Sequence, residues 1–244
     1  MKLRLLIVVA LLAAFAACKR TGDNHESKVD LQFGDNHDMI RKPQAEIDEL
    51  IKESKAKLKD GDLIMRSDDG IESESLRSFS TKDKSFSHCG IVFIENDTPV
   101  VYHNMAGDEN PTENLLRQTF DYFVDSKHKT GFGVFQYSLT PEETEKLHNL
   151  SKEYLAKGLK FDKTFDLKTD DKMYCAEMIY KFLRQATNGR MNLPTTTIKN
   201  FRVRDPKYKG LVLKEFVYVA LDNLYLNPFC KELTRVAYFT PKVK

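Results

Sequence analysis

The chain has 244 residues, of which 41% are hydrophobic and 30% charged, a balance typical of a globular protein with one sizeable domain. Lys and Arg number 38 against 36 Asp and Glu, so no strongly basic surface indicates a nucleic-acid partner. Beyond the first 17 residues, no apolar stretch approaches the roughly 18 residues that a membrane-spanning helix needs.

The N-terminus has the pattern of an export signal. Two basic residues precede an apolar run at 5–17 that ends in Ala-Ala, directly before Cys18. This ending resembles the lipobox of bacterial lipoproteins, although Phe15 stands where Leu is usual. We therefore expect cleavage before Cys18, lipid on its thiol, and a place in the bacterial cell envelope, anchored to a membrane and facing the periplasm or the exterior. The alternatives are a secreted protein cut nearby and an uncleaved anchor.

The polar residues 18–42 are predicted to form a flexible tether, and residues 43–244 a single domain that begins with a helix. Apolar residues at helical spacing predict helices, and alternating residues predict strands. A Thr-Pro-Glu-Glu sequence at 140–143 predicts a capped helix start. In chain order we expect a helix at 43–60, a strand at 63–65, a short helix near 73–79, strands at 88–94 and 100–103, a helix at 111–124, a strand at 131–139, helices at 140–158 and from 175 onward, and strands at 211–213, 217–220 and 235–239.

The chain has four cysteines, and none lies in a CxxC pair of the kind that binds structural zinc: Cys18, Cys89, Cys175 and Cys230. If Cys18 carries lipid and Cys175 is a working thiol, two cysteines remain. A disulfide between them is open to an exported protein, but two buried free thiols are the simpler interpretation.

Cys175 stands near the start of a predicted helix. Unpaired backbone N–H groups and the helix dipole favour a thiolate there, and the same N–H groups can bind an oxyanion. From its position alone, a buried core cysteine is the better interpretation of Cys175.

Two histidines lie on paired strands of a predicted hairpin. His88 opens one strand and His103 ends the other. A tight turn through 95–99 pairs residues whose numbers sum to about 194, which places His103 opposite residue 91. The two imidazoles share a face only if the register or a bulge permits it. His103 would then orient His88 as the third member of a catalytic triad; otherwise each is a structural histidine.

Four motifs follow one another along the chain: GDLI at 61–64, SHCGIV at 87–92, KFDKTFD at 160–166 and YCAEM at 174–178. In this order they resemble the opening strand, the SHxGI strand, the YDxxF loop and the YCSEL helix of the permuted NlpC/P60 papain-like hydrolases, the YiiX/YaeF-type group. The resemblance covers about residues 60–240.

The resemblance implies an α+β papain-like fold, with an antiparallel sheet or partial barrel packed against helices. It makes Cys175 the nucleophile, His88 the base and His103 the third member. Many permuted relatives have Glu at the third position; His resembles non-permuted NlpC/P60 enzymes. Tyr174, which precedes Cys175, and Ser87, which precedes His88, are expected to contact substrate. Neither a cofactor nor a metal is implied. The chain departs from the family where Ala replaces the Ser after the nucleophile and Met replaces the Leu.

We therefore expect an exported cysteine hydrolase that cleaves an amide bond in cell-wall peptides or small peptide or amino-acid amides. Its partners would be that substrate and, through the anchor, a membrane. Three alternatives remain: an acyltransferase or lipid or thioester hydrolase of the lecithin:retinol acyltransferase type, an inactive binding module, and a metal site built from the same residues.

Overall fold

The computed structural model describes residues 39–125, 127, 129–202 and 212–242. Its main sheet is antiparallel and open, with the strand order β5-β4-β3-β2-β6-β9. These strands are β2 (Leu63–Asp68), β3 (His88–Glu95), β4 (Thr98–His103), β5 (Leu116–Thr119), β6 (Lys129–Tyr137) and β9 (Cys230–Ala237). The predicted α+β class is confirmed, as an open sheet rather than a closed barrel.

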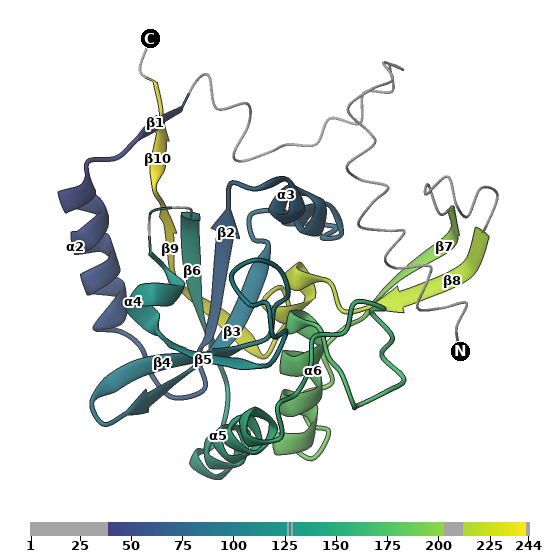
Figure 1. Ribbon diagram of the computed structural model, residues 1–244. Helices are drawn as coiled ribbons and strands as arrows, with labels where there is room; N and C mark the ends of the chain where they lie inside the picture. Colours follow the sequence, from purple (N-terminus) through teal and green to yellow (C-terminus); the bar gives the residue numbers. More distant parts are fainter. Residues whose placement is uncertain (1–38, 126, 128, 203–211, 243–244) are drawn as a thin grey trace.

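The predicted signal at 1–17, the lipidation site Cys18 and most of the tether lie outside the described residues. The last residues assigned to the tether instead form a strand. This strand, β1 (Met39–Arg41), pairs with β10 (Phe239–Pro241) near the C-terminus (Figure 1).

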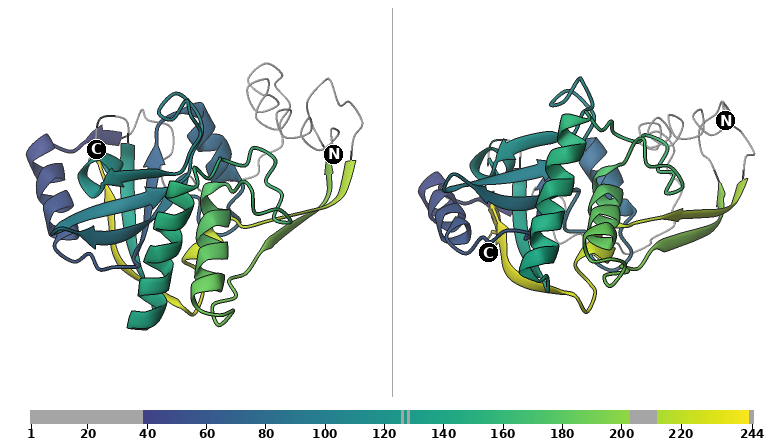
Figure 2. Two further views of the ribbon diagram at one scale, coloured as in Figure 1. Left: turned by 60° about the horizontal axis from the view of Figure 1, so that its bottom comes forward. Right: turned by 90° about the horizontal axis from the view of Figure 1, so that it is seen from below.

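Helices cover both faces of the main sheet. Side chains alternate between the two faces along each strand, and apolar side chains lie on both faces, so each face is covered. The face that carries Leu63, Met65 and Ile91 packs against α5 (Pro141–Ala156) and α6 (Cys175–Ala186), which lie side by side in Figure 2. The opposite face packs against α2 (Gln44–Lys55) and the short α4 (Phe120–Phe123). The core therefore has two layers separated by the sheet.

Local sequence signals explain several elements. Thr140 and Glu143 form the predicted capping box at the start of α5. β3 and β4 form the predicted hairpin, and its two turn residues, Asn96 and Asp97, have φ of 48° and 59°. Two positive φ angles are what a two-residue type I′ turn requires. A short helix, α3 (Ile71–Ser78), lies where one was predicted.

The prediction of one helix at 111–124 is wrong. The segment forms the strand β5, which pairs with β4, followed by the four-residue helix α4. The backbone groups at the edge of β4 gain partners by this pairing, a tertiary contribution that apolar spacing does not reveal.

A two-stranded ribbon projects from the body of the molecule (Figures 1 and 2). It consists of β7 (Thr196–Arg202), which was not predicted, and β8 (Val212–Tyr218). The single strand β8 replaces the two strands predicted at 211–213 and 217–220, although residue 211 lies outside the described residues. In the part of the chain that is described, no helix is both long and apolar enough to cross a membrane.

Asp222 holds the loop that leads toward β3. This carboxylate is buried in the 3-10 helix η4 (Leu221–Leu224), and its Oδ2 accepts hydrogen bonds from the backbone N–H groups of Thr81 at 2.9 Å, Lys82 at 2.7 Å and Asp83 at 3.3 Å. Asp222→Ala should lower the free energy of unfolding by about 2–3 kcal/mol, because three backbone donors in part-buried hydrogen bonds lose a carboxylate acceptor. Urea denaturation measures this loss.

Asp222→Asn retains one carbonyl oxygen and should cost about half as much. A free energy of unfolding for Asp222→Ala within about 0.5 kcal/mol of the wild-type value would contradict this assignment.

Candidate active site

Cys175 is the first residue of α6, directly after the N-cap residue Tyr174. Its side chain is 7% exposed. The pKa of its thiol is lowered chiefly by a hydrogen bond from the Cys89 thiol, against the effect of burial, with backbone N–H groups of Ala176, Cys89 and Cys175 itself adding to the decrease. The Cys89 thiol is therefore the main group that favours the thiolate form, and the N–H groups at the start of the helix add to its effect.

Cys89 contacts the candidate nucleophile, and the sequence analysis did not assign it to the candidate site. Burial and the hydrogen bond to Cys175 raise the pKa of the Cys89 thiol well above its ordinary value, so Cys89 stays protonated and donates. The alternation of side chains along β3 could have indicated this contact. It points residue 89 away from His88, toward the apolar face of the sheet that packs against α6. Cys89, Cys175 and Cys230 are all free thiols.

The two predicted histidines meet on one face of the β3–β4 hairpin. His88 Nε2 and His103 Nδ1 are 2.8 Å apart. The predicted register was wrong by one residue: Ile91 pairs with Tyr102, so paired numbers sum to 193 and His103 falls across from Gly90. Residues 88, 90 and 103 then share a face.

Gly90 makes this meeting sterically feasible. A Cβ atom on Gly90 would lie 2.4 Å from Val101 Cγ1 and 3.1 Å from His103 Cβ. The absence of a side chain therefore lets the end of β4, with its imidazole, lie close against β3.

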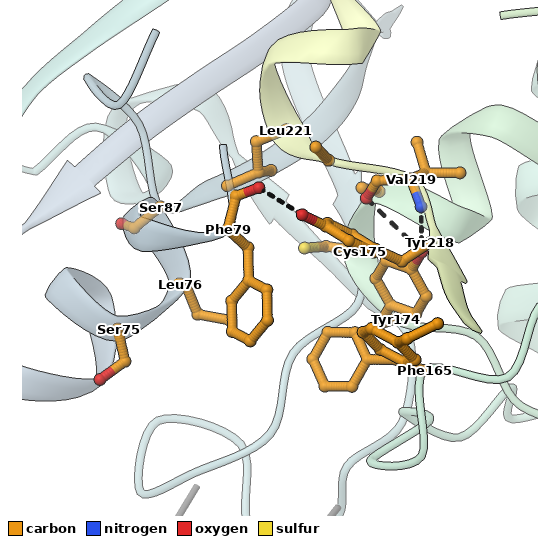
Figure 3. Close-up of a pocket in the computed structure, with 13 residues that line it drawn as sticks. Ser75, Leu76, Phe79, Ser87, Phe165, Tyr174, Cys175, Tyr218, Val219 and Leu221 are labelled. Carbon is orange, nitrogen blue, oxygen red and sulfur yellow. Dashed lines mark hydrogen bonds between the residues drawn. The ribbon is translucent and has the colours of Figure 1, made fainter. Parts of the chain in front are cut away.

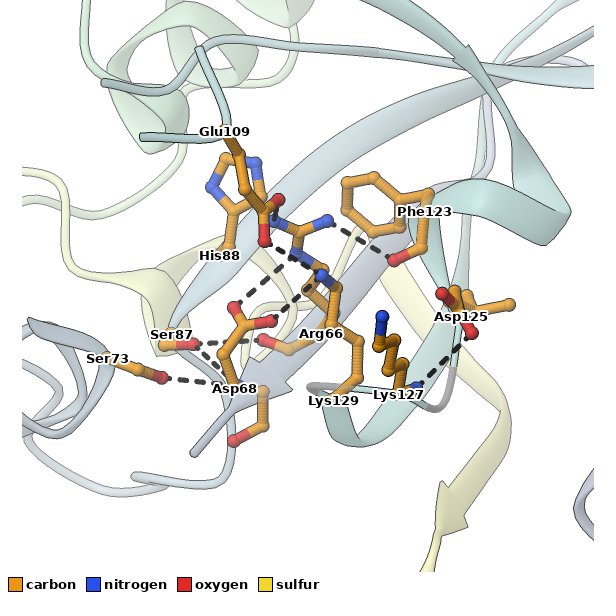
Figure 4. A network of polar contacts seen from close by, with 12 residues as sticks. Arg66, Asp68, Ser73, Ser87, His88, Glu109, Phe123, Asp125, Lys127 and Lys129 are labelled. Atoms are coloured by element: carbon orange, nitrogen blue, oxygen red, sulfur yellow. Dashed lines mark hydrogen bonds and ion pairs between the residues drawn. The ribbon is translucent and has the colours of Figure 1, made fainter. Parts of the chain in front are cut away.

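Both imidazoles are buried beside cations, and Figure 4 shows His88 next to Arg66. Arg66 pairs with His88 across β2 and β3, and its guanidinium lies 4.8 Å from the centre of the Phe123 ring, which packs against both histidines. Burial, followed by the charge of Arg66, lowers the pKa of His88 well below its ordinary value and that of His103 to about 3. Lys129 adds to both shifts. Both rings are therefore neutral at pH 7.

Carboxylates balance the two cations. Arg66 forms ion pairs with Asp68 at 3.5 Å and Glu109 at 3.3 Å, and Lys129 forms ion pairs with the same two residues at 3.6 and 3.2 Å. This network, drawn in Figure 4, is a supporting layer around the histidines, because each buried cation already has acidic partners.

Cys175 and His88 flank the beginning of β3 without bonding to each other. The thiol contacts Cys89, the next residue after His88, on the α6 side of the sheet, whereas His88 contacts His103 and Phe123 on the α4 side. Among the described contacts, no hydrogen bond joins the sulfur to the imidazole. His103 contacts Nε2 of His88, so Nδ1 is the ring nitrogen of His88 that takes no part in this contact.

An apolar pocket opens onto Cys175 (Figure 3). Its enclosed volume is about 40 Å³. Cys175 and both predicted substrate-binding residues, Tyr174 and Ser87, line it together with the aromatic rings of Phe79, Phe165, Phe216 and Tyr218. The Tyr174 hydroxyl accepts a hydrogen bond from the Val219 N–H at 2.7 Å, and that of Ser87 donates to the Arg66 carbonyl oxygen at 3.4 Å. Both hydroxyl groups thus form hydrogen bonds with backbone groups.

Comparison with known families agrees with this architecture. The model of a family described as permuted papain-like amidases, the YaeF/YiiX type or C92 family, matches residues 57–230. The chain belongs to this family. The resemblance seen in the four sequence motifs is thereby confirmed.

Two relatives of the YaeF/YiiX type illustrate how far the likeness extends. A protein of Escherichia coli K12 named uncharacterized protein YiiX is 24% identical over 169 residues, which span 69% of this chain and 78% of that protein. The crystal structure of metalloprotein YiiX from Escherichia coli O157:H7 superposes with a TM-score of 0.58 at 20% identity, covering 73% of this chain and 98% of that one. The latter likeness shows a shared fold.

The word metalloprotein describes the solved relative. In this member of the YaeF/YiiX family, the described residues include no group of three or more His, Cys, Asp or Glu side chains arranged to hold a metal ion. His88 and His103 instead bind each other.

Removing the Cys89 thiol tests its influence on Cys175. Cys89→Ala should slow alkylation of Cys175 at mildly acidic pH by about three- to tenfold, because the pKa of Cys175 rises when this donor is lost. The measurement is the iodoacetamide labelling rate, followed by peptide mass spectrometry. Cys230→Ala is the matched control, since Cys230 is not among the groups that shift the pKa of Cys175. Equal labelling rates in Cys89→Ala and the wild type would show that the two thiols do not interact.

Proposed function

We propose that the protein is an exported cysteine amidase in which Cys175 is the nucleophile, His88 the general base and His103 the residue that orients the base. The observations that support this most directly are the pairing of His88 with His103 at 2.8 Å and the lowered pKa of the Cys175 thiol, which contacts Cys89, the neighbour of His88 in β3. Membership of a family of papain-like amidases supports the reaction class.

The first half of the proposed reaction forms an acyl-enzyme. The Cys175 thiol transfers its proton to Nδ1 of His88, and the thiolate attacks the carbonyl carbon of the amide. The backbone N–H of Cys175, which has no intrahelical partner at the first position of α6, donates a hydrogen bond to the oxyanion. The C–N bond then breaks, and His88 returns its proton to the leaving amine.

The second half releases the product. His88 takes a proton from water, whose oxygen attacks the thioester carbon, and the C–S bond breaks as Cys175 recovers a proton. A neutral His88 is the form that accepts the proton in both steps. Because its lowered pKa makes it a weak base, the proposal requires the negative charge of the Cys175 thiolate to stabilise the imidazolium once the two side chains meet.

The proposal requires the sulfur to turn from Cys89 toward His88. Cys175 is the first residue of α6, at the end of the helix rather than in its interior, so a change of side-chain rotamer needs no change in the helix. Catalytic hydrogen bonds are often long or absent until substrate binds. In this view the hydrogen bond from Cys89 belongs to the resting state.

The substrate class follows from location and pocket. We propose that Cys18 is lipidated after removal of residues 1–17, which would hold the enzyme at a membrane of the cell envelope. There it would meet cell-wall peptides, short peptides and amino-acid amides. The apolar lining of the pocket beside Cys175 favours a substrate with an apolar group next to the scissile carbonyl.

That same lining supports a second candidate, hydrolysis or transfer of an apolar acyl group from a lipid or thioester. The chemistry at Cys175 would be unchanged, and the aromatic rings of Phe79, Phe165 and Phe216 would receive the acyl chain. Since the enclosed volume is about 40 Å³, the pocket would have to widen to accept a long chain.

One experiment separates the candidates. The mature protein with Cys175→Ala is incubated with a digest of cell-wall peptides, with amino-acid amides, and with acyl lipids, and retained molecules are identified by native mass spectrometry. The wild-type protein is then assayed on each retained molecule. Amine release from a peptide or amide supports the amidase, and a lipid-derived acyl group on wild-type Cys175 supports the second candidate. Retention without turnover by the wild type would indicate a binding module.

A further inference from the structure

The hydrogen bond between His88 and His103 has two mutually exclusive arrangements. Both rings are neutral, so each carries one proton on one of its two nitrogens. Either His88 Nε2–H donates to His103 Nδ1, or His103 Nδ1–H donates to His88 Nε2. Only the first arrangement leaves Nδ1 of His88 with a free lone pair, and the second leaves it protonated and unable to act as a base.

Gln118 distinguishes these arrangements. Its Oε1 lies 2.9 Å from Nε2 of His103. A carbonyl oxygen only accepts, so His103 carries its proton on Nε2 and presents a lone pair at Nδ1. His88 must then donate from Nε2, and its own Nδ1 is free.

The backbone holds Gln118 in place. β5 pairs with β4 so that Val101 stands opposite Gln118 and His103 opposite Leu116. Residues directly opposite each other share a face, and positions two apart do so as well. Gln118 and His103 therefore reach each other diagonally across two hydrogen-bonded strands.

Among the hydrogen bonds of the described residues, Gln118 is the partner of His103 besides His88. Arg66 and Lys129 bear only donors, which ion pairs with Asp68 and Glu109 engage, and the Phe123 ring is apolar. The amide oxygen of Gln118 is thus the feature that breaks the symmetry of the histidine pair.

We propose that Gln118 is a positioning residue that sets the tautomers of His103 and His88 and so makes Nδ1 of His88 the proton acceptor for Cys175. This inference rests on the proposed role of His88 as base. No proton moves along the hydrogen-bonded series from His88 through His103 to Gln118. When His88 accepts the Cys175 proton, its Nε2–H continues to donate to His103, and the Nε2–H of His103 continues to donate to Gln118.

The tautomers are measurable without any substrate. In the mature wild-type protein labelled with ¹⁵N-histidine, NMR should show both His88 and His103 protonated at Nε2 and unprotonated at Nδ1 at neutral pH. Resonances are assigned with His88→Ala and His103→Ala. A wild-type His88 protonated at Nδ1 would overturn the inference whatever the variants do.

Two substitutions at Gln118 test its influence. Gln118→Met has a similar length but no acceptor of comparable strength, so the tautomers should become mixed and alkylation of Cys175 should slow by about tenfold or more. Gln118→Glu restores an acceptor and should return His88 to the Nε2–H form. Arg117→Met, at the neighbouring position and bonded to Glu95, is the control and should change neither measurement.

The results distinguish this inference from the proposed function. If His88→Ala slows alkylation but Gln118→Met leaves both rate and tautomers unchanged, His88 is the base and Gln118 does not set it. If His88→Ala leaves the alkylation rate and the turnover of any identified substrate unchanged, the proposed function itself is wrong.

Discussion

Replacing His88 with Ala should slow the labelling of Cys175 by iodoacetamide at about pH 5.5 by at least tenfold and abolish amide turnover. An ordinary thiol, with a pKa near 8.5, is only about 0.1% thiolate at that pH. Faster labelling of Cys175 than of a model thiol therefore requires stabilisation of the thiolate, and a nearby base that takes the proton adds to what the helix start supplies. Cys175→Ala should lower turnover by about 10³-fold or more.

The same experiment contains its own control. Burial raises the pKa of the Cys230 thiol to about 12, so Cys230 should remain almost unlabelled in both proteins. If wild-type Cys175 is labelled no faster than a model thiol, and urea denaturation shows a cooperative unfolding transition, the result would instead favour a binding module with an inactive site.

Gly90→Ala should destabilise the protein by about 3 kcal/mol or more and remove the reactivity of Cys175. The added Cβ would lie 2.4 Å from Val101 Cγ1 and 3.0 Å from the Tyr102 carbonyl oxygen, distances that force β3 and β4 apart. Because His103 is at the end of β4, separating the strands also breaks its hydrogen bond to His88. Urea denaturation and iodoacetamide labelling measure the two effects.

Gly70→Ala is the matched control for this substitution. No atom lies within 4 Å of a Cβ built on Gly70, and its φ of −76° suits any residue. We expect a loss of at most about 1 kcal/mol, because Ala is a poorer N-cap residue than Gly. If Gly90→Ala were equally mild, the close approach of β3 and β4 would not be what joins the two histidines.

Local signals were sufficient for the elements that carry the site. The Thr-Pro-Glu-Glu sequence predicted the start of α5, apolar spacing predicted α6 with Cys175 at its first turn, and two apolar runs around a polar turn predicted the β3–β4 hairpin. Each depends on contacts within about ten residues, which the order of side chains along the chain encodes directly.

The register of the hairpin shows where such reasoning ends. A difference of one residue in the pairing of Ile91 decides whether His103 shares a face with His88. Turn geometry and the close packing at Gly90 set that register, and neither is visible in apolar periodicity. The prediction of a helix at 111–124 was wrong for a related reason, since the pairing of β5 with β4 outweighed the helical spacing of the apolar residues.

By itself, the sequence determined the family, through the resemblance of its four motifs, and with it the expected fold class and the candidates Cys175, His88 and His103, because motifs are local properties of the chain. The tertiary structure alone decided which groups touch them. Cys89 reaches Cys175 through the packing of α6 on the sheet, and Gln118 reaches His103 through the pairing of β5 with β4. Both contacts join residues distant in sequence, and only the burial of two sheet faces and the satisfaction of strand edges bring them together.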